Sequence, residues 1–172
     1  MALRMGLVPI PLAGKVPLKP QWEQTTAEGA MSHIRRYLRQ GLVSNIGVLT
    51  GASSGIVVFD IDPDGTALWQ SLIQQYGEPQ TLKVLTPRGG FHYYFNYDGG
   101  ALRTTNKIAQ TGLDFRSDGG QVVFPFGSSS EGRPYQIVNG CRRAGGEYEF
   151  QLLGMPAWLD QFIRERSART YA

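Results

Sequence analysis

Two aspartates in a hydrophobic run are the residues of this chain best suited to chemistry. Asp60 and Asp62 end the strand-forming segment Val57–Asp62. Side chains alternate along a strand, so both carboxylates project from one face, about 6–7 Å apart. Neighbouring carboxylates repel each other unless a cation lies between them, and their oxygens suit Mg²⁺ or Mn²⁺ better than zinc. The alternative is an exposed strand end before an Asp-Pro-Asp-Gly turn.

Two later segments also place polar residues on one face of a strand. His92 alternates with aromatic residues in 91–95, and Asp114 and Arg116 alternate with apolar residues in 113–116. The alternation predicts one polar sheet face, with apolar partners packed on helices beneath it. Its members are Asp60, Asp62, His92, Asp114 and Arg116. Taken singly, His92 could be a histidine hydrogen-bonded to backbone, Asp114 a support for a turn and Arg116 a salt-bridge partner. Together they indicate a functional site.

The segment before the histidine has the composition of an anion-binding loop. Thr86-Pro87-Arg88-Gly89-Gly90 presents one cation and two glycines immediately before a strand. Glycines let backbone amides approach an anion, and a guanidinium matches phosphate oxygens in geometry. A plain hairpin turn explains the glycine pair nearly as well. The loop is not a P-loop, because that motif's lysine and hydroxyl are missing.

The rest of the chain predicts short strands and three helices in one domain spanning residues 1–172. A capping box of Thr25 and Glu28 predicts a helix to about Gln40, with Met31, Ile34, Tyr37 and Leu38 as its apolar stripe. Asp64 is expected to cap a second helix, Thr66 to Tyr76, and Pro156 to open a third, to about Arg166. The predicted strands are Gly6–Leu12 at a sheet edge, Asn45–Thr50, Val57–Asp62, Leu82–Thr86, Phe91–Tyr97, Gly112–Arg116 and Gln121–Phe126. This order predicts an α/β (α+β) fold with a mixed sheet.

Composition excludes several classes of protein. The lone Cys141 rules out an internal disulfide and suits a reducing cytoplasm. Only two histidines accompany it, so Cys and His cannot build a zinc module. No apolar stretch reaches transmembrane length, and prolines interrupt the first twelve residues, which disfavours a signal peptide. The formal net charge of +3 permits a nucleic-acid partner without requiring one.

These motifs, in this order, resemble the primase–polymerase (Prim-Pol) domain of the archaeo-eukaryotic primase superfamily, found in plasmid and phage replication proteins. The family's acidic-x-acidic strand end is similar to Val57–Asp62. Its histidine strand is similar to Gly89–Phe95, and its hydrophobic-aspartate motif to Leu113-Asp114. Further similarity extends along nearly the whole chain, at Gly14-Lys15-x-Pro17, Trp22, Asn45–Gly51 and Pro156-x-Trp158-Leu159.

The resemblance implies an RRM-like catalytic core and a nucleotidyltransferase, a DNA primase and DNA-directed DNA polymerase. Asp60, Asp62 and Asp114 would hold two divalent ions, Mg²⁺ or Mn²⁺. His92 would hydrogen-bond the nucleotide's phosphates, with Arg88, Gly89, Gly90 and Arg116 beside it. Expected partners are nucleoside triphosphates and a DNA template with a DNA or RNA primer, with a helicase of the same replication system as a further candidate. The zinc element, helicase and small helical domain of several relatives have no counterpart here, so primer extension is better supported than de novo priming.

Two other functions remain open from the residues. Carboxylates beside a histidine also serve metal-dependent nucleases. A non-catalytic module could bind single-stranded nucleic acid, stacking bases on Tyr93, Tyr94 and Phe95. The alternation disfavours that module, because it buries Tyr93 and Phe95 and leaves His92 exposed.

Overall fold

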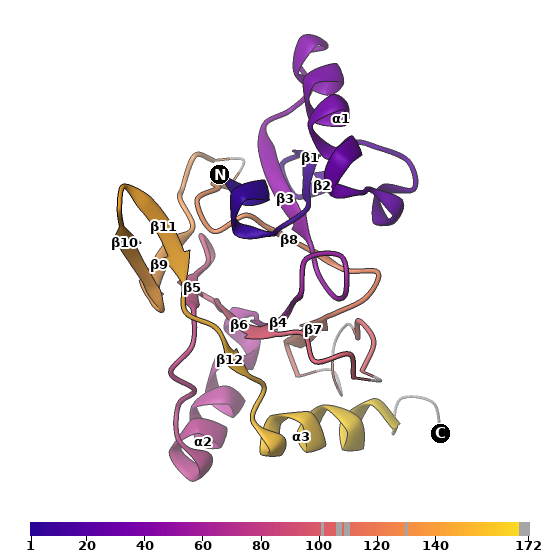
Figure 1. Cartoon of the computed structure of the whole chain (residues 1–172). Helices are drawn as coiled ribbons and strands as arrows, with labels where there is room; N and C mark the ends of the chain where they lie inside the picture. The colour runs from indigo at the N-terminus through magenta and orange to yellow at the C-terminus, as the bar shows by residue number, and fades with distance from the viewer. Residues whose placement is uncertain (101, 106–107, 109–110, 130, 169–172) are drawn as a thin grey trace.

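The computed structural model describes residues 1–100, 102–105, 108, 111–129 and 131–168, so the last four residues of the predicted domain lie outside it. These residues form a single α+β domain with two main β-sheets, a separate hairpin and three α-helices (Figure 1). The α-helices are α1 Ala27–Arg39, α2 Thr66–Tyr76 and α3 Ala157–Ala168, and short 3₁₀ turns occur at η1 Ala2–Met5, η2 Trp22–Gln24 and η3 Pro63–Gly65. The strands are β1 Pro9–Ala13, β2 Val16–Pro17, β3 Asn45–Leu49, β4 Ile56–Ile61, β5 Lys83–Leu85, β6 Phe91–Asn96, β7 Leu113–Arg116, β8 Gln121–Val123, β9 Gln136–Asn139, β10 Cys141–Ala144, β11 Glu147–Phe150 and β12 Leu153–Gly154.

The first sheet has the strand order β2-β1-β3-β8, with every pair antiparallel. Its strand β1 pairs with β3 along most of its length but with β2 only at Leu12 and Ala13. Its outer edge therefore has no strand partner at Pro9, where proline's missing N–H costs no ladder bond, whereas the Pro11 carbonyl accepts the Leu18 amide at 3.0 Å. The expected edge strand is confirmed for this half of β1. Helix α1 lies against β1 and buries Ala30 and Ile34.

The second sheet carries the polar strands and has the order β7-β4-β6-β5-β9. These pairs are antiparallel, and β12 adds a parallel pair at the end of β6, which makes the sheet mixed as expected. Strand β4 lies between β6 and β7. Its residues therefore have cross-strand neighbours on both sides.

Alternation along β4 divides its side chains between two hydrophobic cores. Val57, Phe59 and Ile61 pack with Trp69 of α2 and with Leu159, Phe162 and Ile163 of α3. Val58 points to the other face, where it joins residues of the first sheet. Helices α2 and α3 thus cover one face of the second sheet (Figure 1), and the first sheet lies over part of the other. The face opposite the helices is the one that carries Asp60.

The helix ends differ from the sequence-based prediction. Thr26, not Thr25, caps α1, since its hydroxyl accepts the Gly29 amide at 3.2 Å. Helix α2 begins at Thr66 as predicted, but Asp64 does not cap it, because residues 63–65 first form the turn η3. Thr25 and Thr26 are adjacent and equally suited by type to cap a helix. Which of them does so depends on the backbone conformation at the start of the helix.

Two other expectations were incomplete. Met31 and Leu38, predicted in the buried stripe of α1, are exposed, because β1 contacts only one narrow side of that helix. The strands β9 to β12 were not predicted, since their mixed composition lacks a clear alternation. No helix within the described residues is long and apolar enough to cross a membrane.

Candidate active site

Strand pairing brings three of the predicted polar residues into one row. Asp60 on β4 is in register with His92 on β6 and with Asp114 on β7. Directly opposed residues of antiparallel strands project from the same face, with Cβ atoms about 4.5–5.5 Å apart. His92 and Asp114, 32 and 54 positions away in the chain, therefore become the neighbours of Asp60 on its two sides. The structure brings the central part of the predicted polar face together.

A network of charges holds these side chains. The His92 Nε2 lies 3.4 Å from Asp60 Oδ1. Arg116 donates to Asp114 Oδ2 at 2.6 Å, and the same guanidinium nitrogen lies 3.8 Å from Asp60 Oδ2. Arg116 therefore neutralises the two facing carboxylates at once. Both the functional role and the simpler role of ion-pair partner, considered from sequence, are compatible with this position.

Opposing effects act on the ionisation of Asp60. Burial raises the pKa of this carboxyl, but His92 and Arg116, with a smaller effect of Lys15, outweigh it and lower the pKa below its usual value. Asp60 is consequently a carboxylate at neutral pH. It can accept a hydrogen bond from His92 or contribute its charge to a bound cation.

His92 is buried, which contradicts the expectation that it is exposed. It is 5% exposed, with its ring 5.7 Å from that of Tyr135 and 6.1 Å from that of Tyr94. Alternation correctly gave its face of the strand but could not show what covers that face. Its Nδ1 is buried without a hydrogen-bond partner, so the ring has an unused polar atom beside the carboxylates.

Asp62 lies at the exposed end of the same row. Burial raises its pKa, and the charges of Asp60 and Asp114 raise it further, against weaker opposing effects of Arg88 and Lys15. Although Asp62 follows the last residue of β4, it is close enough to Asp60 and Asp114 for their charges to act on its carboxyl. This uncompensated negative charge is what a divalent cation would relieve.

The predicted anion-binding loop packs against this end of β4. A Cβ on Gly90 would meet the Ile61 carbonyl oxygen at 2.1 Å, so only glycine permits the approach. The amides of Gly89 and Gly90 donate within the loop, to the backbone oxygen and hydroxyl of Thr86. The glycines therefore hold the loop in place. Arg88, whose charge acts to lower the pKa of Asp62, is the residue of this loop that is suited to bind an anion.

A cleft of about 380 Å³ opens over the charged row, between the two sheets. Asp60, His92 and Arg116 line one wall, and residues 120–123 with Lys15 line the other. Tyr135 also lines the cleft; burial and the charge of Asp60 raise its pKa to about 12. No sequence signal identified Tyr135, because it precedes an irregular strand far from the motifs.

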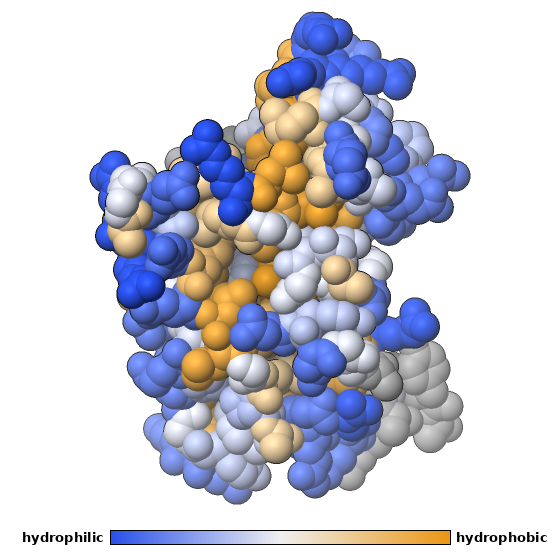
Figure 2. Space-filling model, viewed as in Figure 1, coloured by the Kyte–Doolittle hydropathy of each residue, from blue (hydrophilic) through white to orange (hydrophobic). Residues whose placement is uncertain are grey.

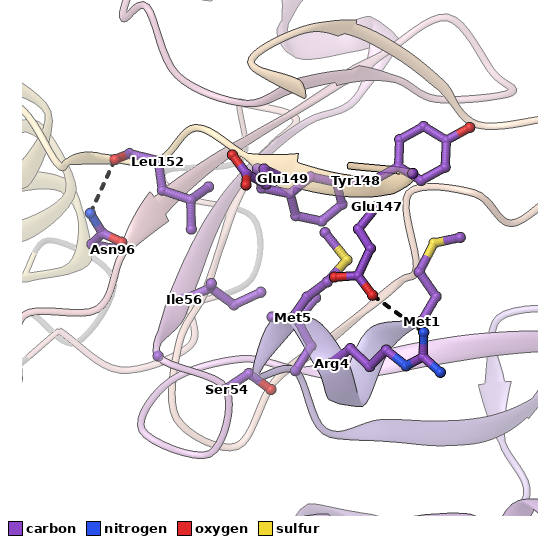
Figure 3. A pocket seen from close by; sticks show the side chains of 14 residues that line it. Met1, Arg4, Met5, Ser54, Ile56, Asn96, Glu147, Tyr148, Glu149 and Leu152 are labelled. Carbon is purple, nitrogen blue, oxygen red and sulfur yellow. Dashed lines mark hydrogen bonds and ion pairs between the residues drawn. The ribbon is translucent and has the colours of Figure 1, made fainter. Parts of the chain in front are cut away.

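A larger pocket, of about 940 Å³, lies elsewhere, between η1 and the β10–β11 hairpin (Figure 3). Met5, Ile56 and Leu152 line it, and Arg4 pairs with Glu147 at 3.3 Å on its rim. Both charged side chains are well exposed to solvent. Because its charged side chains are exposed and not gathered into a row, this pocket is a poorer catalytic candidate than the smaller cleft.

The carboxylates of the acidic row, of which Asp60 lines the cleft, fit a hard divalent cation by type. The three aspartates offer only oxygen, the ligand that Mg²⁺ and Mn²⁺ prefer, and Asp62 carries charge that nothing nearby neutralises fully. In the described part of the chain, however, no three His, Cys, Asp or Glu side chains are already gathered as a metal site. Arg116 instead bridges Asp60 and Asp114. A cation therefore has to compete with this guanidinium for the carboxylates.

The fold and this site define a class of α+β domains in which carboxylates from neighbouring antiparallel strands meet at a cleft between two sheets. Residues 1–158 match the family Prim-Pol, described as "bifunctional DNA primase/polymerase, N-terminal", and the chain belongs to this family. The resemblance noted from the sequence motifs is thereby confirmed. Among curated proteins, none matches the chain significantly.

The raised pKa of Asp62 gives a testable effect on stability. Above its folded-state pKa, ionised Asp62 costs stability, and this cost disappears as the pH falls and the group is protonated. We expect Asp62→Asn to raise the Tm of the metal-free protein at pH 7, by up to about 2 °C given its exposure. Thermal unfolding in EDTA measures this change in Tm, with the exposed Asp64→Asn variant as the matched control. An equal rise at pH 3, or a lower Tm at pH 7, would contradict the assigned repulsion.

Proposed function

We propose that this chain is a template-directed nucleotidyltransferase that adds nucleotides to the 3′-hydroxyl of a primer, with residues 1–172 acting as one catalytic domain. The observation that carries the proposal is the register of Asp60 with both His92 and Asp114, at a cleft, in a chain of the primase/polymerase family. Family membership supports DNA and nucleotides as substrates. The assignment of residues to steps is our own.

The side chains of the acidic row and those around it each have a role in this proposal. Asp60, Asp62 and Asp114 would hold two divalent cations, Mg²⁺ or Mn²⁺. When bound, these ions lower the pKa of the primer hydroxyl and neutralise the leaving pyrophosphate. His92, whose Nε2 lies 3.4 Å from Asp60, would donate a hydrogen bond to a phosphate oxygen of the nucleotide. Arg88, Lys15 and Arg116 would supply further positive charge, because phosphoryl transfer depends mainly on positioning and charge neutralisation.

A primer-extension assay tests the proposal. With Mg²⁺ or Mn²⁺, we expect a labelled primer on a longer template to lengthen, with deoxynucleotides or ribonucleotides supplied in separate reactions. Excess EDTA should stop the reaction, and restored metal should recover it. Absence of extension in all four combinations of metal and nucleotide would refute the polymerase assignment.

The same gel distinguishes the alternative functions. Shortening of the labelled strand without added nucleotide would indicate a metal-dependent nuclease. The structure disfavours a base-stacking module of the kind considered from the sequence, since Tyr93, Tyr94 and Phe95 are all at most 1% exposed. Their rings lie inside the two cores and cannot stack on bases.

A further inference from the structure

The excess positive charge of this chain lies in one short segment. Residues 15–39 contain five basic and two acidic residues, whereas the remainder contains twelve of each. The whole formal net charge of +3 therefore comes from the β1–β2 turn and the helix α1. The concentration is a property of one surface and not of the protein as a whole.

Helix α1 presents the larger part of this charge to solvent. Arg35, Arg36 and Arg39 are exposed, on the side away from the buried Ala30 and Ile34. Figure 2 shows hydrophilic side chains projecting at the top of the molecule, where Figure 1 places α1. The face also exposes Met31 and Leu38, at 39% and 53%. The exposed part of the helix is therefore basic, with two apolar residues along the edge of its buried side.

Several exposed arginines within the described residues pair with a carboxylate, but these three do not, nor do Arg88, Arg103 and Arg143. Within the described residues, none of the three α1 arginines forms an ion pair, and Arg36 only stacks on the Tyr37 ring at 5.9 Å. By contrast, the exposed Arg133, Arg142 and Arg164 each pair with a glutamate or aspartate at 2.6 Å. The charge of α1 is thus available to an external anion.

A chain of contacts connects this helix to the cleft. After α1 ends, Ser44 accepts the Gly14 amide at 2.7 Å, which ties the end of the helix to the β1–β2 turn. Lys15, which follows Gly14 in this turn, lines the cleft, and its charge acts to lower the pKa of both Asp60 and Asp62. Lys15 therefore adds a basic group beside the acidic row, on the turn that is tied to the segment after α1.

We propose that Arg35, Arg36 and Arg39 bind the phosphate backbone of the primer–template DNA outside the cleft. This inference rests on the proposed function, which supplies the polyanion. Arg35 and Arg39 are one helical turn apart, about 6 Å along the axis, a span of roughly two phosphates on one strand. Backbone contacts of this kind fix the register of the DNA and carry no sequence preference. The helix face holds the substrate while Lys15 directs it toward the reacting groups.

Binding of a labelled primer–template in EDTA without nucleotide, followed by fluorescence anisotropy, tests this surface separately from catalysis. The variant Arg35→Gln/Arg36→Gln/Arg39→Gln should weaken binding at least about tenfold at 100 mM salt and reduce the salt-dependence slope by about 2 to 3. The matched control, Arg133→Gln/Arg142→Gln/Arg164→Gln, removes the same charge from paired arginines and should bind like the wild type. Replacement of the three α1 arginines by lysine should keep most of the slope, and circular dichroism checks that the helix persists.

Equal loss in both triple variants would overturn the proposal, because net charge alone would explain it. Unchanged affinity in the α1 variant, or no DNA binding by the wild type, would also overturn it. Binding of the wild type to vesicles of anionic lipid, but not to DNA, would assign the face to a membrane instead. DNA binding that depends on α1 without primer extension would refute the proposed function alone, while extension without α1 dependence would refute this inference alone.

Discussion

Asp60→Asn is expected to reduce nucleotide incorporation by about 10³-fold or more while leaving the protein folded. Asp60 is the central member of the acidic row, in register with His92 on one side and Asp114 on the other. Asparagine keeps the shape and one acceptor oxygen for His92 but removes the charge. Groups that stabilise charge developing in a phosphoryl transfer commonly contribute effects of this size.

Single-turnover primer extension at saturating metal measures the effect on the chemical step. The exposed Asp64→Asn, four positions along the chain, is the matched control and should retain wild-type activity. Thermal unfolding shows whether the variant is folded. Incorporation within tenfold of the wild type by folded Asp60→Asn would refute the assignment of this carboxylate to the site.

Trp69→Ala is expected to lower the free energy of unfolding by about 3–5 kcal/mol. Trp69 of α2 is fully buried, and its ring lies 5.2 Å from Phe59 of β4 and 4.9 Å from Tyr93 of β6. It is thus the main contact between α2 and the two strands that carry Asp60 and His92 on their opposite face. Removing the indole leaves a cavity that the surrounding aromatic rings cannot fill.

Urea denaturation followed by circular dichroism gives this free energy. Tyr76→Ala is a suitable control, because Tyr76 also stacks on Trp158, at 4.9 Å, but is 49% exposed. Its replacement should cost about 1 kcal/mol or less. A similar loss in both variants would show that burial of Trp69 does not dominate the packing of α2 on the sheet.

The location of the candidate site could be predicted because its information is local. A strand repeats every two residues, so the spacing of Asp60 and Asp62, and of Asp114 and Arg116, already gives their face. The first and last residues of α2 could also be predicted from the sequence. Its apolar positions lie between Gly65 and Gly77, and glycine is unfavourable in the interior of a helix.

Other features depend on segments that are distant in the chain. The His92 ring lies against Tyr135, 43 positions further along the chain, which its own strand does not specify. The exposure of Met31 and Leu38 likewise depends on how little of α1 the strand β1 covers. A sequence pattern shows which residues can be buried, whereas the partner surface determines which of them are.

The sequence by itself determined the polar face, the aspartates and histidine on it, and the family to which their order points. Only the tertiary structure decided that Asp60 lies opposite Asp114, that Arg116 bridges them, and that Lys15 from another sheet completes the cleft. The physical reason is that side-chain direction follows from backbone geometry within a strand. Strand register and the approach of two sheets follow from the packing of the whole chain.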